Sequence, residues 1–472
     1  MNINDLGIIR HEVLLAAVIL LTVILSIFSS WNRLARSLPL LLFIIVVAAG
    51  VAPGQEGFLF NGNFISSPLV KAMKNILNAA ILIIMLQVAG NKRESEKDDN
   101  MIRVCLAMFV SLLGLYIMLS SGSLPVFYAG LEISALPFLI IFLISSRERS
   151  LRRMTIIRIS LYTVASILVI SGILLIFKAS GSVLFSELIK KNMNTPDNLA
   201  GLIIMFTGMT IKAGVTPFLI PDNGFSRRMQ ISLLSYLTVV LMGGMFFILT
   251  ILLYSVFPSL HIFWQKSILI ISILMITGGN ILLFFQKSIR GFLVSSSFLQ
   301  AGYILAGLIG ANRFGMESMI YAVICYVFSA LAVTGVISIF YDRTGKERIS
   351  DFKGIYGVNP RFGLLLGIGL LSLAGIPPLA GFFGRFFLFL AAAEQNFYFL
   401  VLVASLNMVF SLYCYSRFAG TLFRGTGDKH EEVITSTPSS IAWMIICLAG
   451  ILLSGAAGFI FDYLRTISFG VL

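Results

Sequence analysis

Long apolar segments separated by short polar loops repeat along the whole chain. A membrane-spanning helix needs about 20 predominantly apolar residues, so the pattern predicts an all-α polytopic membrane protein with about 14 transmembrane helices. The first apolar segment begins too far into the chain for a cleaved signal peptide, and we interpret it as a span. The predicted spans cover residues 12–30, 38–53, 72–90, 101–119, 124–145, 157–178, 198–220, 231–256, 267–285, 291–311, 317–341, 362–384, 398–416 and 440–461.

The composition agrees with a membrane protein. Of the 472 residues, 58% are hydrophobic and 12% are charged, whereas about a quarter of a soluble domain is charged. The four cysteines and three histidines are scattered and form no motif typical of an iron–sulfur, haem or metal site. The chain also lacks a GxGxxG motif and a P-loop, so we expect it to bind no nucleotide or redox cofactor itself.

Positive charge is concentrated in alternate loops. If the N-terminus lies outside, the odd-numbered loops face the cytoplasm, and they carry most of the 34 Lys and Arg residues. Because Lys and Arg are enriched in cytoplasmic loops, this pattern predicts that both termini lie on the outer side. The net charge of +13 follows from these loops and indicates contact with a lipid bilayer, not with nucleic acid.

Two similar motifs interrupt two of the apolar segments. Residues 213–217 read Ala-Gly-Val-Thr-Pro and residues 374–378 read Ala-Gly-Ile-Pro-Pro, so Pro217, Pro377 and Pro378 lie where a continuous helix is expected. In lipid, such an interruption persists only where protein or a water-filled cavity satisfies the freed backbone groups. We therefore predict a broken helix at each motif, beside an ion path.

The two predicted broken helices are spans seven and twelve, which five crossings separate. Because five is odd, they run in opposite directions through the membrane, which is typical of an inverted repeat. The ion path is then expected near the midplane, where the two repeats meet. The predicted organisation is an N-terminal three-helix segment at 1–100, two inverted five-helix repeats at 101–256 and 257–423, and a C-terminal helix at 424–472.

Two opposite charges lie inside predicted spans of the first repeat. Glu132 is about eight residues into span five, ~12 Å deep, and Lys212 is about 14 residues into span seven, just before the first break. A charge in the bilayer centre costs about 2.5–3.5 kcal/mol and marks a functional path by default. The depths allow an ion pair that an arriving proton can break. The alternative is a static pair that only fixes helix packing.

Arg385 follows the second break. An arginine keeps its proton at any working pH, so it can hold a carboxylate or water in place but cannot relay a proton. The alternative is a cation that extends to the outer surface. Further candidates for the path are Arg158 at the start of span six, Gln300 in span ten, and Tyr236 and Thr238 in span eight. Each of these also has a structural alternative, as an interface anchor or as packing between helices.

Residues 372–386, Ser-Leu-Ala-Gly-Ile-Pro-Pro-Leu-Ala-Gly-Phe-Phe-Gly-Arg-Phe, closely resemble the broken twelfth helix of the antiporter-like membrane subunits of respiratory complex I. Residues 130–137 and 212–218 resemble the fifth and seventh helices of that family, and the similarity covers most of the chain from about residue 100. Among these subunits the chain looks most similar to subunit N. The resemblance implies that Glu132 and Lys212 are the glutamate and lysine that the family pairs.

Three positions depart from the family pattern. The eighth-helix lysine of the family is missing, Gln300 replaces a tenth-helix histidine, and Arg385 replaces a titratable lysine or glutamate. Arg158 falls near a family lysine at the start of the sixth helix. The resemblance thus implies an intact proton input in the first repeat, but not an intact relay through the second.

The resemblance implies a proton-translocating subunit of a bacterial NADH:quinone oxidoreductase in the inner membrane, bound to neighbouring antiporter-like and small membrane subunits. NADH, FMN, iron–sulfur clusters and quinone would be bound by other subunits, so this chain would carry no catalytic centre. Two alternatives stay open. One is a related subunit of a membrane-bound hydrogenase, formate hydrogenlyase or multisubunit cation/proton antiporter. The other is a structural spacer whose proton path has decayed.

Overall fold

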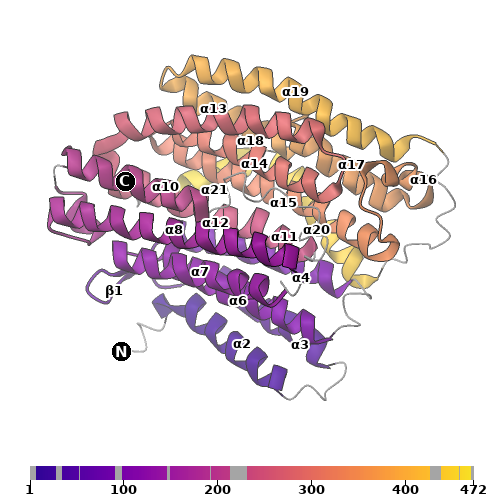
Figure 1. Cartoon of the computed structure of the whole chain (residues 1–472), viewed down its shortest axis with the longest axis horizontal. Helices are drawn as coiled ribbons and strands as arrows, with labels where there is room; N and C mark the ends of the chain where they lie inside the picture. The colour runs from indigo at the N-terminus through magenta and orange to yellow at the C-terminus, as the bar shows by residue number, and fades with distance from the viewer. Residues whose placement is uncertain are drawn as a thin grey trace.

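The computed structural model describes residues 7–27, 34–52, 54–90, 98–145, 149–191, 193–212, 231–425, 437–456 and 458–468. Within these ranges the chain is almost entirely helical, and a helix lies in each of the fourteen predicted spans. Ten of the described helices are long and apolar enough to cross a membrane, and two more are shorter apolar helices. Figure 1 shows these long helices lying side by side, with their axes roughly parallel.

The elements follow one another in three groups. The N-terminal group is α2 (Arg10–Ile27), α3 (Leu34–Val51), β1 (Gly57–Leu59), β2 (Phe64–Ser66) and α4 (Pro68–Ala89). The first half is α6 (Asp98–Leu119), α7 (Leu124–Ser145), α8 (Arg149–Ser180), α9 (Phe185–Leu188), α10 (Pro196–Lys212), α11 (Ile231–Ser235), η2 (Tyr236–Leu241), α12 (Met242–Ile251) and η3 (Leu252–Val256). The remainder is η4 (Pro258–Leu260), α13 (His261–Phe285), α14 (Ile289–Leu308), α15 (Arg313–Thr344), η5 (Ile349–Phe352), α16 (Ile355–Val358), α17 (Pro360–Ala374), α18 (Ala380–Glu394), α19 (Tyr398–Phe423), α20 (Pro438–Gly455) and α21 (Gly458–Ile467).

One end of the helices carries the β1–β2 hairpin, and we call it the hairpin side. The two strands pair antiparallel, with Leu59 opposite Phe64. The Ile65 amide donates to the Ser120 carbonyl (2.8 Å), and the Phe185 amide donates to the Gly122 carbonyl (2.9 Å). The hairpin, the turn between α6 and α7, and the segment after α8 therefore lie together on this side.

The opposite side carries the connections after α13 and after α15. The Ile289 amide donates to the Glu347 carbonyl (2.9 Å), and the Ile349 amide donates to the Lys287 carbonyl (3.0 Å). α17 begins from this opposite side, whereas α10 follows α9 on the hairpin side (Figure 1). α10 and α17 therefore run in opposite directions, as the predicted inverted repeat requires.

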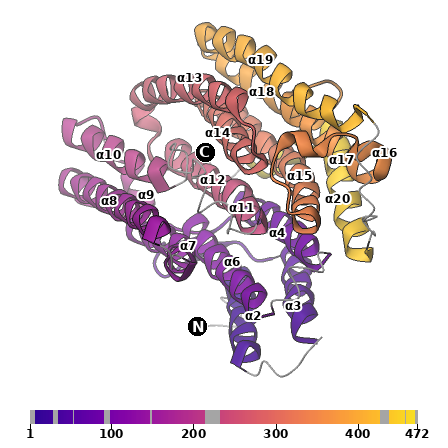
Figure 2. The same ribbon diagram turned by 45° about the vertical axis from the view of Figure 1, so that its right-hand side comes forward.

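The centre of the molecule is formed by three crossings. Residues 231–256, α14 and α15 are almost wholly buried, whereas α8 and α19 expose much of their apolar surface. Figure 2 shows α12, α14 and α15 in the middle, with α8 and α10 on one side and α18 and α19 on the other. α10, which leads to the first predicted break, and α18, which follows the second, therefore flank a common buried core.

The structure differs from the predicted spans in three places. The twelfth span does not end at 384, because α18 continues to Glu394 after the break, so its two halves are of equal length. The hydropathy pattern stops early there because Arg385 interrupts the apolar run. Span eight is not a regular α-helix, since η2 and η3 are π-helical segments within it. The β-hairpin and α21 were not predicted, because their elements are short.

Candidate functional site

Glu132 of α7 and Lys212 of α10 form an ion pair. The Lys212 ammonium donates to Glu132 Oε1, and the side chain of Lys212 is fully buried whereas that of Glu132 is 26% exposed. Side chains on a helix point toward its N-terminus, so Lys212, at the C-terminal end of α10, reaches back toward the hairpin side and meets Glu132. The contact that the sequence predicted between these two residues is thus present.

α8 positions this ion pair because it contacts both α7 and α10. Tyr162 of α8 donates its hydroxyl to the carbonyl of Lys212, the last described residue of α10 (3.2 Å). The Lys212 ammonium lies 5.9 Å from the ring centroid of Tyr128 and 6.0 Å from that of Tyr162. These two aromatic faces give the cation further electrostatic support inside the protein.

Glycines let α8 and α10 approach backbone to backbone. A Cβ at Gly172 of α8 would lie 2.5 Å from the Gly201 carbonyl oxygen of α10. A Cβ at Gly208 of α10 would lie 2.6 Å from the Ala165 carbonyl oxygen of α8. Small residues at helix contacts of this kind are typical of membrane proteins. They fix α10, and hence Lys212, close to the tyrosine that caps it.

The second break lies between α17 and α18. Gly375 ends α17 in the left-handed conformation (φ 86°), and its amide donates to the Ser372 carbonyl (2.9 Å). The Ser372 hydroxyl accepts from the Gly381 amide (3.1 Å), at the start of α18, and bonds the Ser329 hydroxyl of α15 (2.7 Å). Backbone groups freed by Pro377 and Pro378 are thus satisfied by side chains, as a break in lipid requires.

Arg385 of α18 holds the broken end of α17. Its guanidinium donates to the carbonyls of Leu373 and Ala374, the latter at 2.7 Å. It also lies 4.3 Å from the ring centroid of Tyr303. Because Arg385 is only 3% exposed, the alternative in which it extends to the outer surface is wrong. Its charge is permanent, and here it serves as a cap.

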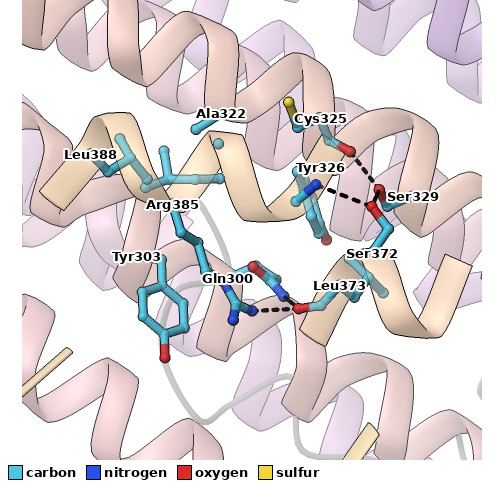
Figure 3. A pocket seen from close by; sticks show the side chains of 13 residues that line it. Gln300, Tyr303, Ala322, Cys325, Tyr326, Ser329, Ser372, Leu373, Arg385 and Leu388 are labelled. Carbon is cyan, nitrogen blue, oxygen red and sulfur yellow. Dashed lines mark hydrogen bonds between the residues drawn. The ribbon is translucent and has the colours of Figure 1, made fainter. Parts of the chain in front are cut away.

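Gln300 of α14 joins the same polar group. Its amide nitrogen donates to the Leu373 carbonyl (2.9 Å) and to the Tyr415 hydroxyl (3.3 Å). Figure 3 shows Gln300 and Arg385 converging on Leu373, beside a cavity of about 20 Å³. A cavity of this volume holds about one water molecule. Among the described side chains lining it, neither Gln300 nor Arg385 can exchange a proton at a working pH.

Tyr236 and Thr238 lie in the π-helical segment η2, between the two halves. The Thr238 hydroxyl bonds the Leu234 carbonyl of its own helix (2.8 Å), and its carbonyl accepts from the Tyr326 hydroxyl of α15 (2.9 Å). Tyr236 packs on Phe138 of α7, with ring centroids 5.2 Å apart. π-Helical segments occur frequently at functional sites. Here the segment connects the helix of Glu132 to the helices around Arg385.

Two sequence candidates lie outside what the structure describes. Pro217 is among the residues that are not described, as is the side chain of Arg158 in α8. Within the described ranges, no group of three or more His, Cys, Asp or Glu side chains could hold a metal ion.

The sequence reasoning missed a second buried ion pair. The Lys74 ammonium of α4 lies 2.5 Å from Glu12 Oε1 of α2, and Lys74 is 1% exposed. The predicted span began at residue 72, which placed Lys74 at the membrane interface. α4 in fact begins at Pro68, with Ser67 as its N-cap, so Lys74 lies more than a turn inside. The polar residues within this helix, among them Lys74, Asn75 and Asn78, were the feature of the sequence that could have indicated a buried polar contact.

Comparisons with known proteins agree on one family. The model of the family described as NADH:quinone oxidoreductase/Mrp antiporter, TM, matches residues 121–411. NADH-quinone oxidoreductase subunit N of Azobacteroides pseudotrichonymphae is 33% identical over all of both chains. Subunit N of Phocaeicola vulgatus is 28% identical over 98% of this chain and 99% of its own.

Solved structures share the fold at lower identity. A chain of respiratory complex I from Thermus thermophilus superposes with a TM-score of 0.78 at 18% identity and covers 96% of this chain and 99% of its own. A chain of the Mrp complex from Dietzia sp. gives 0.78 at 17% identity, with 99% and 100% covered. The curated relatives are more similar in sequence than these structures, so they place the chain more narrowly within the family. The chain therefore belongs to the NADH:quinone oxidoreductase/Mrp antiporter membrane family, and within it to the subunit N group of NADH-quinone oxidoreductases.

Proposed function

We propose that this chain is a proton-translocating membrane subunit of a respiratory NADH:quinone oxidoreductase, and that Glu132 and Lys212 form its exchangeable pair. The observation that carries this proposal is the fully buried Lys212 ammonium, held by one carboxylate at the end of α10. A charge buried this way is costly unless it is paired. The pair therefore responds strongly to any proton or charge that arrives beside it.

The pair works as a switch through the charge of Glu132. When Glu132 takes up a proton, its attraction for the Lys212 ammonium is lost, and Lys212 is left as an unpaired buried cation. Lys212 then releases its proton more readily, because burial disfavours the charged form of a lysine. A proton transfer from Glu132 to Lys212 restores the starting state, so one proton has moved.

Electron transfer would occur in other subunits. NADH, FMN, iron–sulfur clusters and quinone would be bound by partner chains, and the charge changes of quinone reduction would reach this pair through neighbouring membrane subunits. The chain would contribute no redox step. Its exposed apolar helices α8 and α19 supply surface for the bilayer or for such neighbours.

The experiment that tests the proposal uses the assembled complex. Glu132→Gln and Lys212→Ala should lower the number of protons moved per electron, whereas Glu187→Gln and Lys190→Ala remove the same charges from exposed positions and should not. NADH oxidation and proton movement into vesicles are measured together. If both site variants assemble and keep the wild-type ratio, the pair is not part of a proton path.

A second candidate function is a spacer that does not conduct. The specific observation in its favour is the second break, where the permanent cation Arg385 and the neutral amide Gln300 hold the backbone. The same experiment separates the two functions, because a spacer keeps its wild-type proton ratio after Glu132→Gln.

We also propose that the hairpin side faces outward from a bacterial inner membrane. The opposite side carries exposed cations at Lys287 and Arg348, which cytoplasmic loops favour. The four native cysteines are buried, so single cysteines can be introduced and labelled. In intact cells, an impermeant maleimide should label Ser186→Cys on the hairpin side and spare Ser350→Cys on the other. The reverse result would invert the orientation.

A further inference from the structure

A cluster of polar side chains lies inside the N-terminal helices, apart from the Glu132–Lys212 pair and from the break between α17 and α18. We call it the N-terminal polar cluster. It lies near the hairpin side, since Ser120 directly follows α6 there and its carbonyl accepts from the hairpin. Its members are His11 and Glu12 of α2, Lys74, Asn75 and Asn78 of α4, Tyr116 of α6 and Ser120.

The centre of the cluster is an ion pair with a third polar partner. The Lys74 ammonium lies 2.5 Å from Glu12 Oε1 and donates to the Ser120 hydroxyl at 2.6 Å. The side chain of Lys74 is 2% exposed and that of Glu12 is 13% exposed. The ammonium also lies 5.5 Å from the ring centroids of Phe64 and Tyr116. The two lysines are about equally buried, and the carboxylate of Glu12 is less exposed than that of Glu132, so this pair is removed from water at least as completely.

The cluster has unused hydrogen-bonding capacity. Glu12 Oε2 and Asn78 Nδ2 are buried and have no hydrogen-bond partner among the described residues. A Cβ at Gly50 of α3 would lie 2.5 Å from Asn75 Oδ1, 3.2 Å from His11 Nε2 and 3.5 Å from Asn78 Nδ2. Polar atoms of three side chains thus converge on a backbone that has no side chain of its own. Buried polar groups are normally satisfied, so a free acceptor on a carboxylate marks a place for a proton or a water molecule.

The cluster connects inward to the centre of the molecule. The Tyr116 hydroxyl donates to Asn78 Oδ1, and Tyr236 of η2 lies within electrostatic range of Tyr116. The Tyr236 hydroxyl is buried near Ser111 of α6 without a well-formed hydrogen bond. Tyr236 also packs on Phe138, which lies on the same helix as Glu132. Polar side chains therefore lead from Tyr236, which touches the helix of Glu132 through the apolar ring of Phe138, to the hairpin side without entering the second half.

The chemistry of this route differs from that around Arg385. A carboxylate and an ammonium can each gain or lose a proton, whereas a guanidinium cannot. The side chains of His11, Arg10, Lys71 and Tyr116 also face the pair, and His11 Nε2 lies 3.4 Å from Asn75 Oδ1. The N-terminal helices thus contain the exchangeable groups that the second break lacks.

We propose that the N-terminal polar cluster is a second proton-transfer site, which passes protons between the centre of the membrane and the hairpin side. A proton binds the free oxygen Oε2 of Glu12, and the neutral carboxyl no longer holds the Lys74 ammonium. Lys74 then releases a proton toward the hairpin side. Transfer of the Glu12 proton to Lys74 restores the ion pair, so one proton crosses and no electron moves. This inference rests on the proposed translocation by the chain.

The decisive variant is Lys74→Arg in the assembled complex. Arginine keeps the positive charge and the ion pair but cannot release its proton, so a purely structural pair tolerates it and a relay does not. We expect Lys74→Arg and Glu12→Gln each to lose as many protons per electron as Glu132→Gln. The double variant of Glu12→Gln with Glu132→Gln should lose no more than either single variant, because the two sites act in series.

Two further variants keep the test decisive. Glu12→Asp retains a titratable carboxylate and should keep most of the wild-type proton ratio, even if Glu12→Gln fails to assemble. The control is Glu56→Gln. Lys71, one helical turn from Lys74, forms an ion pair of 3.7 Å with the half-exposed carboxylate of Glu56, and the loss of this pair should leave the proton ratio unchanged. If the assembled Lys74→Arg complex keeps the wild-type ratio while Glu132→Gln still loses protons, the second proton-transfer site is overturned and the proposed function stands. A wild-type ratio in both would overturn the proposed function as well.

Discussion

Two buried cations, Lys212 and Arg385, lie beside the positions where the sequence predicts broken helices, but different chemistry holds them. Lys212 pairs with the carboxylate of Glu132, and an ammonium and a carboxylate can each change their protonation. Arg385, beside the break between α17 and α18, binds the carbonyls of Leu373 and Ala374, and no described carboxylate forms an ion pair with it. The two cations therefore differ in use: Lys212 supplies an exchangeable charge in one half, and Arg385 supplies a permanent cap in the other.

Substitution of Arg385 is the most direct test of this difference between the two cations. Arg385→Met would leave the buried Ala374 carbonyl without a donor and the Leu373 carbonyl with Gln300 alone. An unsatisfied buried group costs about 1–3 kcal/mol and a lost hydrogen bond to a charged group about 1.5–3 kcal/mol, so we expect a loss of about 3–5 kcal/mol in stability. The thermal midpoint and yield of the assembled complex measure it. Arg417→Met on α19 removes an exposed arginine and is the matched control.

The matched change in the first half should behave differently. Lys212→Met leaves Glu132 partly exposed and able to take up a proton, so the loss of stability should be smaller than for Arg385→Met while proton transfer is lost. If the two substitutions destabilise the complex equally and Lys212→Met keeps proton transfer, Lys212 is a structural cap like Arg385 and not a switch.

A smaller effect is expected where α8 meets α10. Gly208→Leu would place a side chain against the Ala165 carbonyl and force the helices apart, which costs about 1–3 kcal/mol. The same displacement moves Lys212 away from Glu132, so the number of protons per electron should fall as well. Gly420→Leu, whose Cβ meets nothing within 4 Å, serves as the control. Unchanged proton transfer would mean that the α8–α10 contact does not position Lys212.

Substitution of Gln300 tests whether the polar group around Arg385 in the second half takes part in proton transfer. Gln300→Leu removes one donor from the Leu373 carbonyl, which Arg385 still binds, so the expected loss is about 1 kcal/mol. Chemical denaturation measures the stability, and the proton ratio is recorded in parallel. If the second half only supports the fold, the ratio stays at the wild-type value. A lower ratio would assign Gln300 and its water-sized cavity to the path.

The smallest effect is expected at Tyr162. Tyr162→Phe removes one hydrogen bond to the Lys212 carbonyl, which is worth about 0.5–1.5 kcal/mol. The exposed Tyr463→Phe should cost nothing measurable. An abolished proton ratio in Tyr162→Phe, with stability lowered by no more than this amount, would show that the Tyr162 hydroxyl takes part in transfer itself.

Much of the fold follows from the sequence because hydropathy reports helices in lipid directly. The fourteen spans and the opposed directions of α10 and α17 were predicted from that pattern, and the break between α17 and α18 from its proline motif. The other predicted break, at 213–217, lies outside the described residues. The similar depths of Glu132 and Lys212, 80 residues apart, made their contact possible, but hydropathy says nothing about which helices are neighbours, and only the family resemblance implied that these two residues pair.

The remaining features depend on packing that a one-dimensional pattern does not record. The capping role of Arg385 requires the positions of carbonyls in another helix, eleven and twelve residues away. Lys74 was assigned to an interface because a span edge is uncertain by about a turn, and burial there is decided by α2 and α6. The π-helical turn at Tyr236 has no local signal, because Leu, Thr and Val suit either kind of helix.

The π-helical turn at 236–241 takes up one residue more than an α-helical turn would. Removing one residue there would therefore narrow it to a regular α-helix and leave the faces of the flanking helices in place, because the loss is absorbed within the turn. Gly244, where a Cβ would lie 2.9 Å from Leu115, would keep its close contact with that side chain. Removing one residue from the regular helix at 242–251 would instead rotate everything beyond it by ~100°. We therefore expect this buried crossing to accept a deletion only within its π-helical segment.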